Sequence, residues 1–306
     1  MVSAVFHDPL AASQEPAESK RDTKAMAAAV AAKPEPVPVV AGTPREPFDW
    51  LGFAVKLFAP IAGLALLVGI WALLTMKGGS FPTPGATWEA AVKLFSSPFY
   101  SRGPNDQGIG WNIFASLQRV AVGFGLAALV GIPAGFLIGR FALLNQMVAP
   151  LISLLRPVSP LAWLPIGLLV FKAANPAAIW TIFICSIWPM VINTAVGVQR
   201  VPSDYLNVAR VLNLSEWKIV TRILFPAVLP YMLTGVRLSV GTAWLVIVAA
   251  EMLTGGVGIG FWVWDEWNNL NVAHIIIAIF VIGIVGLLLE QALMLVAKRF
   301  SFDDHH

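Results

Sequence analysis

The most restrictive feature of this sequence is a run of twenty uncharged residues between Arg119 and Arg140. Twenty residues of α-helix span ~30 Å, which matches the hydrocarbon core of a lipid bilayer. Charged residues make up only 12% of the chain, about half their usual share of a soluble domain. Hydrophobic residues make up 58%, and the mean hydropathy is +0.76. We therefore interpret the run as a membrane-spanning helix and the chain as an integral membrane protein.

The other apolar runs predict an all-α membrane protein with about six spans. We expect these spans at about residues 52–76, 113–139, 156–172, 176–197, 227–253 and 273–297. The third is unusual, because only fifteen residues separate Arg156 from Lys172 and three prolines interrupt the segment. We predict a short or broken helix there, preceded by a lateral helix over 143–155. Broken helices are tolerated at membrane depth where they are buried in protein or line an aqueous cavity.

The chain divides into two regions, residues 1–48 and residues 49–306. The first is rich in Ala, Pro, Lys and Glu, so it buries too little apolar area to fold, and we predict a disordered tail. Its basic residues and the even number of spans place both termini on the cytoplasmic side. The polar stretch Pro202–Pro230 falls on that side as well, and the loop Lys77–Gly110 falls outside, with a short helix near 87–95.

Three glycines in the second span, Gly131, Gly135 and Gly139, recur at intervals of four residues. This spacing leaves one face of the helix as bare backbone, the small-xxx-small pattern that lets two membrane helices pack closely. We interpret it as a packing seam in preference to a ligand groove.

Catalytic and cofactor motifs are missing from the sequence. There is no GxxxxGK[ST] phosphate loop, and the glycines before Phe261 do not form GxGxxG. His274, His305 and His306 have no metal-ligand spacing, and the single Cys185 excludes a disulfide framework. We predict that the chain is not an enzyme and that it binds no metal or cofactor itself. We also expect no nucleic-acid partner.

Charges within the membrane are the default candidates for function. Arg237 lies ~10 Å into the fifth span, and Glu251 on the same helix is ~21 Å further along, too far to pair with it. Arg237 therefore needs a partner from another helix, a carbonyl cluster, water or a passing anion, and Arg156 raises the same question. With Trp244 and Glu251, these two arginines form our candidate translocation path.

A second candidate site is the loop around Trp264, Asp265 and Glu266. Its aromatic residues are typical of an interfacial belt, and Trp is also enriched at protein contacts. We favour the belt and keep a contact with an external partner as a hypothesis.

The segment Asn207–Pro226 resembles the cytoplasmic signature of ABC importer permeases, which reads EAA, three residues, G, nine residues, I-x-L-P. The matching positions are Asn207, Val208 and Ala209 for EAA, Asn213 for Gly, and Ile223, Phe225 and Pro226 at the end. The spacing is intact, although Glu, Gly and Leu are replaced. The surrounding segments SLQRVAVGF, RPVSPLAWLP, PMVINTAVGVQRVP and GVGIGFWVWDEWNN resemble the sulfonate, taurine and nitrate branch of this family. Together with the segment around Arg237, the likeness covers about residues 112–290.

This resemblance implies a type I importer fold with a cytoplasmic coupling helix, here at about 203–218. The residues that would couple it to an ATPase are Asn207, Ala209, Arg210, Leu212, Asn213, Leu214, Ser215, Trp217 and Pro226. We expect the apolar face around Ala209, Leu212 and Leu214 to carry the coupling.

The resemblance also implies a set of partners in a bacterial inner membrane. These are a second permease chain, giving a homodimer, two cytoplasmic ATPase subunits that bind ATP and Mg, and an external solute-binding protein. The likeness is greatest to nitrate or nitrite permeases, and bicarbonate permeases come next, followed by organosulfonate or taurine permeases. A self-sufficient secondary anion transporter is a different class, and the lack of internal repeats in the sequence argues against it.

Overall fold

The computed structural model describes residues 50–76, 78 and 81–300 of the chain. It separates two units, residues 1–63 and 64–306, which are treated individually. The described part of the first unit is the beginning of helix α2 (Trp50–Thr75), whose remainder belongs to the second unit. The predicted tail, residues 1–48, lies outside the described residues.

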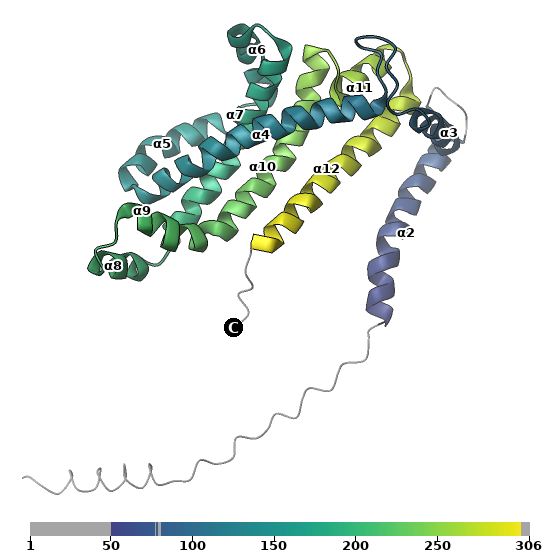
Figure 1. The fold of residues 1–306 in the computed structure, drawn as a ribbon. Coiled ribbons are helices and arrows are strands. Elements are labelled where there is room, and N and C mark those ends of the chain that lie inside the picture. The colour runs from purple at the N-terminus through teal and green to yellow at the C-terminus, as the bar shows by residue number, and fades with distance from the viewer. Residues whose placement is uncertain (1–49, 77, 79–80, 301–306) are drawn as a thin grey trace, which may run out of the picture. The chain divides into compact units, whose positions relative to one another are not determined.

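The second unit is built from helices, apart from one isolated β-bridge in its described residues between Ser101 and Gln107 (Figure 1). After α2 the helices are α3 (Pro84–Phe95), α4 (Ile109–Arg140), α5 (Ala142–Leu155), α6 (Pro160–Phe171), α7 (Ala174–Gln199), α8 (Ser203–Val211), α9 (Glu216–Ile219), α10 (Phe225–Thr254), α11 (Ile259–Asn268) and α12 (Val272–Phe300). A π-helical turn, Val220–Leu224, joins α9 to α10.

Five of the described helices are long and apolar enough to cross a membrane. Their candidate spans are Phe58–Thr75, Ile109–Arg140, Ala174–Gln199, Glu216–Thr254 and Val272–Ala297. The helices α5 and α6 pass the same test only as a pair, and they are bent by 100° relative to each other. The all-α membrane fold is confirmed. The third predicted span, 156–172, corresponds to α6, and the lateral helix predicted over 143–155 corresponds to α5.

The bend between α5 and α6 has a local cause in the sequence. Ser159 precedes Pro160 and has an extended backbone, with φ −57° and ψ 136°. The proline ring disfavours a helical conformation at the residue before it, so the chain turns there. With twelve residues, α6 is only ~18 Å long, too short to cross the membrane alone.

Helix α7 lies at the centre of the second unit and packs against α4, α6 and α10. The predicted seam on α4 is confirmed, because α7 contacts α4 along its glycines. A Cβ atom at Gly135 would lie 2.6 Å from the Cβ of Thr194, and one at Gly139 would lie 2.7 Å from the Cβ of Val198. At these positions the two backbones are therefore closer than any residue larger than glycine would permit.

The polar stretch after α7 does not form the single helix predicted over 203–218. Helix α8 ends at Val211, and Asn213 follows with φ 49°, in the left-handed region. The N–H of Leu214 then bonds to the carbonyl of Ala209 at 3.0 Å, which closes the helix with a Schellman-type cap. Asparagine is tolerated in this conformation, which explains how it replaces the glycine of the permease signature.

The prolines at the end of this stretch do not interrupt the helix that follows. The helix that begins at Glu216 continues through Pro226 and Pro230 to Thr254. Pro226 has no N–H, so the carbonyl four residues earlier lacks its helical partner. Just before Pro226 the backbone hydrogen bonds span five residues instead of four, so the N–H of Phe225 bonds to the carbonyl of Val220.

The seam between α4 and α7 can be tested by replacing glycine with alanine at a packed position and at an open position of α4. We expect Gly135→Ala to destabilise the protein by about 1–3 kcal/mol, because overpacking displaces the α7 backbone. Gly125 lies on the same helix with nothing within 4 Å of a Cβ atom. Gly125→Ala should therefore change the stability by less than about 1 kcal/mol, in the stabilising direction. Thermal unfolding in detergent measures both, and equal losses would contradict the seam.

Candidate functional site

Arg237 has a partner from another helix, which was one of the alternatives that the sequence left open. Its guanidinium forms an ion pair with Glu290 of α12, and the Nε donates a hydrogen bond of 2.7 Å to Oε1. Both side chains are partly exposed along a groove of about 860 Å³ between α10 and α12. The pair neutralises the charge in that groove, so Arg237 is held by a neighbouring helix.

Glu251 is also occupied by contacts within the protein. Its side chain is 2% exposed and forms an ion pair with Arg119 of α4. The hydroxyl of Ser116 lies 2.9 and 2.7 Å from the two carboxylate oxygens. Glu251 is thus the centre of a buried polar cluster formed by Asn112, Ser116, Arg119 and Glu251.

This buried polar cluster fixes the beginning of α11. The first N–H groups of a helix have no partner within the helix. Here the N–H of Gly258 donates to Asn112 Oδ1 at 2.9 Å, that of Ile259 to Ser116 Oγ at 2.9 Å, and that of Gly260 to Glu251 Oε2 at 3.0 Å. The carboxylate also interacts favourably with the positive end of the helix dipole.

The α4 members of this cluster were missed by the sequence reasoning. Asn112, Ser116 and Arg119 are polar residues at intervals of four and three, which places them on one helix face. In an otherwise apolar helix, this spacing was the signal that could have found them. Arg119 also contacts the side chain of Asn175 at the start of α7, and it donates to the carbonyl of Val257 at 2.7 Å.

The remaining predicted residues at this end of α10 have different surroundings. Trp244 is buried, and its indole N–H donates to the carbonyl of Ile282 at 2.9 Å, so it packs α10 against α12. Trp264 and Asp265 are exposed on α11. Glu266 instead faces α12, with Oε2 3.0 Å from Nδ1 of His274.

Arg156 is the predicted path residue whose charge is left without a partner. It occupies the bend between α5 and α6, and no described residue forms a hydrogen bond or ion pair with its guanidinium. Two cavities, of about 300 and 260 Å³, share Arg156 in their walls. The structure therefore retains one of the two arginines of the predicted path as an available cation.

The predicted coupling residues are divided between an inner and an outer side of the α8–α9 segment. Ala209 is 1% exposed and packs with Val198 of α7 and Val228 of α10, and Leu214 packs against the same cluster. Leu212 and Trp217 are 64% and 75% exposed. The single apolar face predicted around Ala209, Leu212 and Leu214 is therefore not present.

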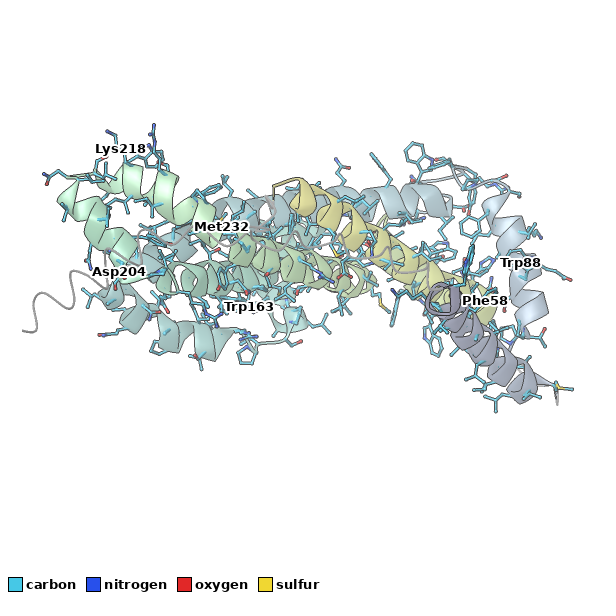
Figure 2. The ribbon with its side chains drawn as sticks, turned by 90° about the horizontal axis from the view of Figure 1, so that it is seen from below. Phe58, Trp88, Trp163, Asp204, Lys218 and Met232 are labelled. Atoms are coloured by element: carbon cyan, nitrogen blue, oxygen red, sulfur yellow. The ribbon has the colours of Figure 1, made fainter. Side chains whose placement is uncertain are left out.

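The other coupling residues define where this segment begins and ends. Asn207 lies on α8, Ser215 is the residue before α9, and Pro226 lies in the first turn of α10. The side chain of Arg210 lies outside the described part. Figure 2 shows Asp204 of α8 and Lys218 of α9 together at one end of the second unit, with Met232 of α10 further along. An ion pair between Arg140 and Glu216, at 3.1 Å, joins the end of α4 to α9.

The importance of the buried polar cluster can be tested by matched substitutions. Glu251→Gln leaves the poorly exposed Arg119 without its counter-charge, and we expect a loss of about 3 kcal/mol or more. Glu216→Gln removes the same charge from the Arg140–Glu216 pair, in which the glutamate is 65% exposed, and there we expect a loss below about 1 kcal/mol. Thermal unfolding in detergent distinguishes them. Equal shifts for the two variants would show that burial does not set the strength of the Glu251 pair.

Comparison with known proteins agrees with this architecture. Residues 131–302 match the model of the family "Binding-protein-dependent transport system inner membrane component". The nitrate import permease protein NrtB of Synechocystis sp. is 49% identical over 81% of this chain and 90% of its own length. The bicarbonate transport system permease protein CmpB of Synechococcus elongatus is 46% identical over 76% of this chain and 85% of its own length.

A solved structure shows the same fold at low sequence identity. An inward-facing form of the MetNI methionine ABC transporter aligns with a TM-score of 0.54 at 14% identity, over 62% of this chain and 95% of the compared chain. The helical arrangement is thus that of a type I ABC importer permease. The family match and the identity to its members together establish that this chain belongs to the binding-protein-dependent inner membrane permeases of ABC transporters.

Proposed function

We propose that this chain is the permease subunit of an ATP-driven importer that moves nitrate or nitrite into the cytoplasm of a bacterium. The observation that carries the proposal is the 49% identity to the Synechocystis nitrate import permease over 90% of that protein. A second nitrate import permease, from Leptolyngbya laminosa, is 47% identical over 95% of its length. The multi-pass helical fold is what such a subunit requires.

Bicarbonate is the second candidate substrate. The bicarbonate permeases are 44–46% identical to this chain, and the nitrate permeases 43–49%. The ranges overlap, so identity ranks nitrate first by a small margin. Both anions are small, planar and singly charged. An organosulfonate or taurine is a more distant alternative, and membership of a binding-protein-dependent family disfavours a self-sufficient secondary anion transporter.

The machinery that we propose has four kinds of component. Two copies of this chain form the pathway as a homodimer in the inner membrane, and an external solute-binding protein delivers the anion. Two cytoplasmic ATPase subunits bind ATP and Mg and hydrolyse the nucleotide, while this chain carries no catalytic site. The family description, which names dependence on a binding protein, supports this division of labour.

We infer that α8 and α9 dock on the ATPase through their exposed apolar residues. Leu212 and Trp217 supply the contact, and Ala209 and Leu214 hold α8 against the start of α10. In this orientation both chain termini are cytoplasmic. A movement of α9 passes directly into α10, because one helical segment runs from Glu216 to Thr254. Rigid-body motion of packed helices is a common means of transmitting a nucleotide-driven change.

The end of α10 remote from α9 is the proposed external side. Helix α10 has thirty residues and is ~45 Å long, which matches a bilayer with its headgroup regions. Helix α11 follows it there and exposes Trp264 and Asp265. These two residues are the proposed contact with the solute-binding protein. Glu266 supports α11 through His274 and is not expected to touch the partner.

The docking surface can be tested with an exposed residue and a matched control. Leu212→Glu places a charge in an apolar contact, and we expect the ATPase subunit to bind about tenfold or more weakly. Leu270, 79% exposed beyond α11, is the control. Leu270→Glu should leave ATPase binding unchanged. Co-purification of the subunits measures both, and normal binding by the Leu212→Glu variant would remove α8 from the interface.

The substrate can be tested by competition in cells that carry the complete complex. We expect uptake of labelled nitrate that depends on ATP and on the binding protein. Nitrite should compete, whereas bicarbonate and taurine in equal excess should not. Uptake of labelled bicarbonate, without uptake of nitrate, would assign the complex to the second candidate. Uptake driven by this chain alone under an ion gradient would refute the importer mechanism.

A further inference from the structure

The two cavities at the bend between α5 and α6 have not been assigned to any function so far. They measure about 300 and 260 Å³ and share Arg156, Cys185, Trp188 and Thr242 in their walls, so they adjoin. Each exceeds the volume of a single water molecule, ~30 Å³, several times. The space therefore accommodates a small ion together with part of its hydration water.

The polar groups in these walls are suited to an anion. Arg156 contributes a guanidinium without a partner among the described residues. The amide of Asn193 uses one N–H on the carbonyl of Pro189, at 2.8 Å, and has a second N–H available. The indole N–H of Trp188 has no partner in the described residues either. No Asp or Glu occurs among the residues that line the two cavities.

The helix α6 adds a second source of positive potential. It begins at Pro160, and the preceding residues Pro157, Val158 and Ser159 line the smaller cavity together with that proline. The N-terminus of a helix carries a partial positive charge of roughly half an elementary unit. Interrupted membrane helices often direct such ends at anionic substrates. The guanidinium and the helix dipole thus act on the same cavity.

The groove that contains Arg237 provides an internal contrast. It is larger, about 860 Å³, but its walls contain both Arg237 and Glu290. The ion pair between them cancels the charge, so an anion entering that groove meets no net attraction. The cavity at Arg156 is the smaller one, yet its charge is not compensated by any described residue.

We propose that the cavity lined by Arg156, Trp188 and Asn193 binds a small planar oxyanion on its way through the permease. The inference rests on the proposed function, because it places that substrate at a site within this chain. The planar fork of an arginine matches a planar oxyanion through two parallel N–H···O bonds. A lysine supplies the charge without this geometry, so the two properties can be separated.

Cys185 provides a reporter in the native sequence, because it is the single cysteine of the chain and lines both cavities. The probe is a pair of methanethiosulfonate reagents, one bearing a sulfonate and one a trimethylammonium group. The thiolate attacks the reagent to form a mixed disulfide, and methanesulfinate leaves. The complete complex in lipid nanodiscs is treated with each reagent, and the mass of the peptide containing Cys185 gives the rate of modification.

We expect the sulfonate reagent to react faster than the cationic reagent in the wild-type complex. Arg156→Gln should lower this preference about tenfold, because one charge is removed close to the thiol. Lys172→Gln is the matched control at the other end of α6, and it should leave the preference unchanged. Nitrate should slow the sulfonate reagent in the wild type. Arg156→Lys should keep the preference for the sulfonate and weaken the protection by nitrate.

Each other outcome has a defined meaning. An unchanged preference in Arg156→Gln, or no modification of Cys185 by either reagent, would overturn the proposed anion site. Protection by bicarbonate but not by nitrate would uphold the site for a planar oxyanion and refute nitrate as the substrate. Protection by taurine alone would overturn planar recognition, because a sulfonate is tetrahedral. If Arg156→Gln does not assemble with its partners, Arg156→Lys is measured in its place. Weaker protection by nitrate in Arg156→Lys would support planar recognition, and unchanged protection would contradict it.

Discussion

The close approach of α4 to α7 is the interaction on which the rest of the structure depends. Lipid is as apolar as leucine, so membrane helices associate through tight packing and hydrogen bonds more than through the hydrophobic effect. The glycines of α4 supply that packing by allowing the α7 backbone to approach. With α4 placed, Asn112, Ser116 and Arg119 reach the start of α11, and with α7 placed, Trp188 and Asn193 reach the bend at Arg156.

The charged residues of the candidate path differ in how their charge is compensated. Glu251 is deeply buried and is matched by an ion pair with Arg119 and by the N–H of Gly260 at the start of α11, so its role is to hold α4, α10 and α11 together. Arg237 and Glu290 compensate each other at a partly exposed seam. Arg156 alone of these lacks a counter-charge in the described residues. Arg156 is thus the arginine of the candidate path whose charge is not compensated within the described residues, and it marks the cavity proposed for the substrate.

The sequence predicted those features that depend on a single helix. Apolar runs bounded by arginines located the spans, and the spacing of Gly131, Gly135 and Gly139 located the seam. The pairs Arg237–Glu290 and Arg119–Glu251 join residues far apart in the chain, and their contact depends on the rotation and depth of separate helices. Spacing along one helix carries no such information. The division of α8 from α9 was predictable in principle, because Asn213 occupies a glycine position of the family signature.

The π-helical turn Val220–Leu224 has a geometric consequence for the surface that precedes it. A π turn contains one residue more than an α turn, and each residue of an α-helix advances by about 100° around the axis. The turn therefore sets the direction in which Trp217 leaves the segment relative to the membrane-embedded face of α10. Deleting one residue there would rotate Trp217 by about a quarter of a circle. The direction of this exposed surface is thus determined by a single extra residue ahead of Pro226.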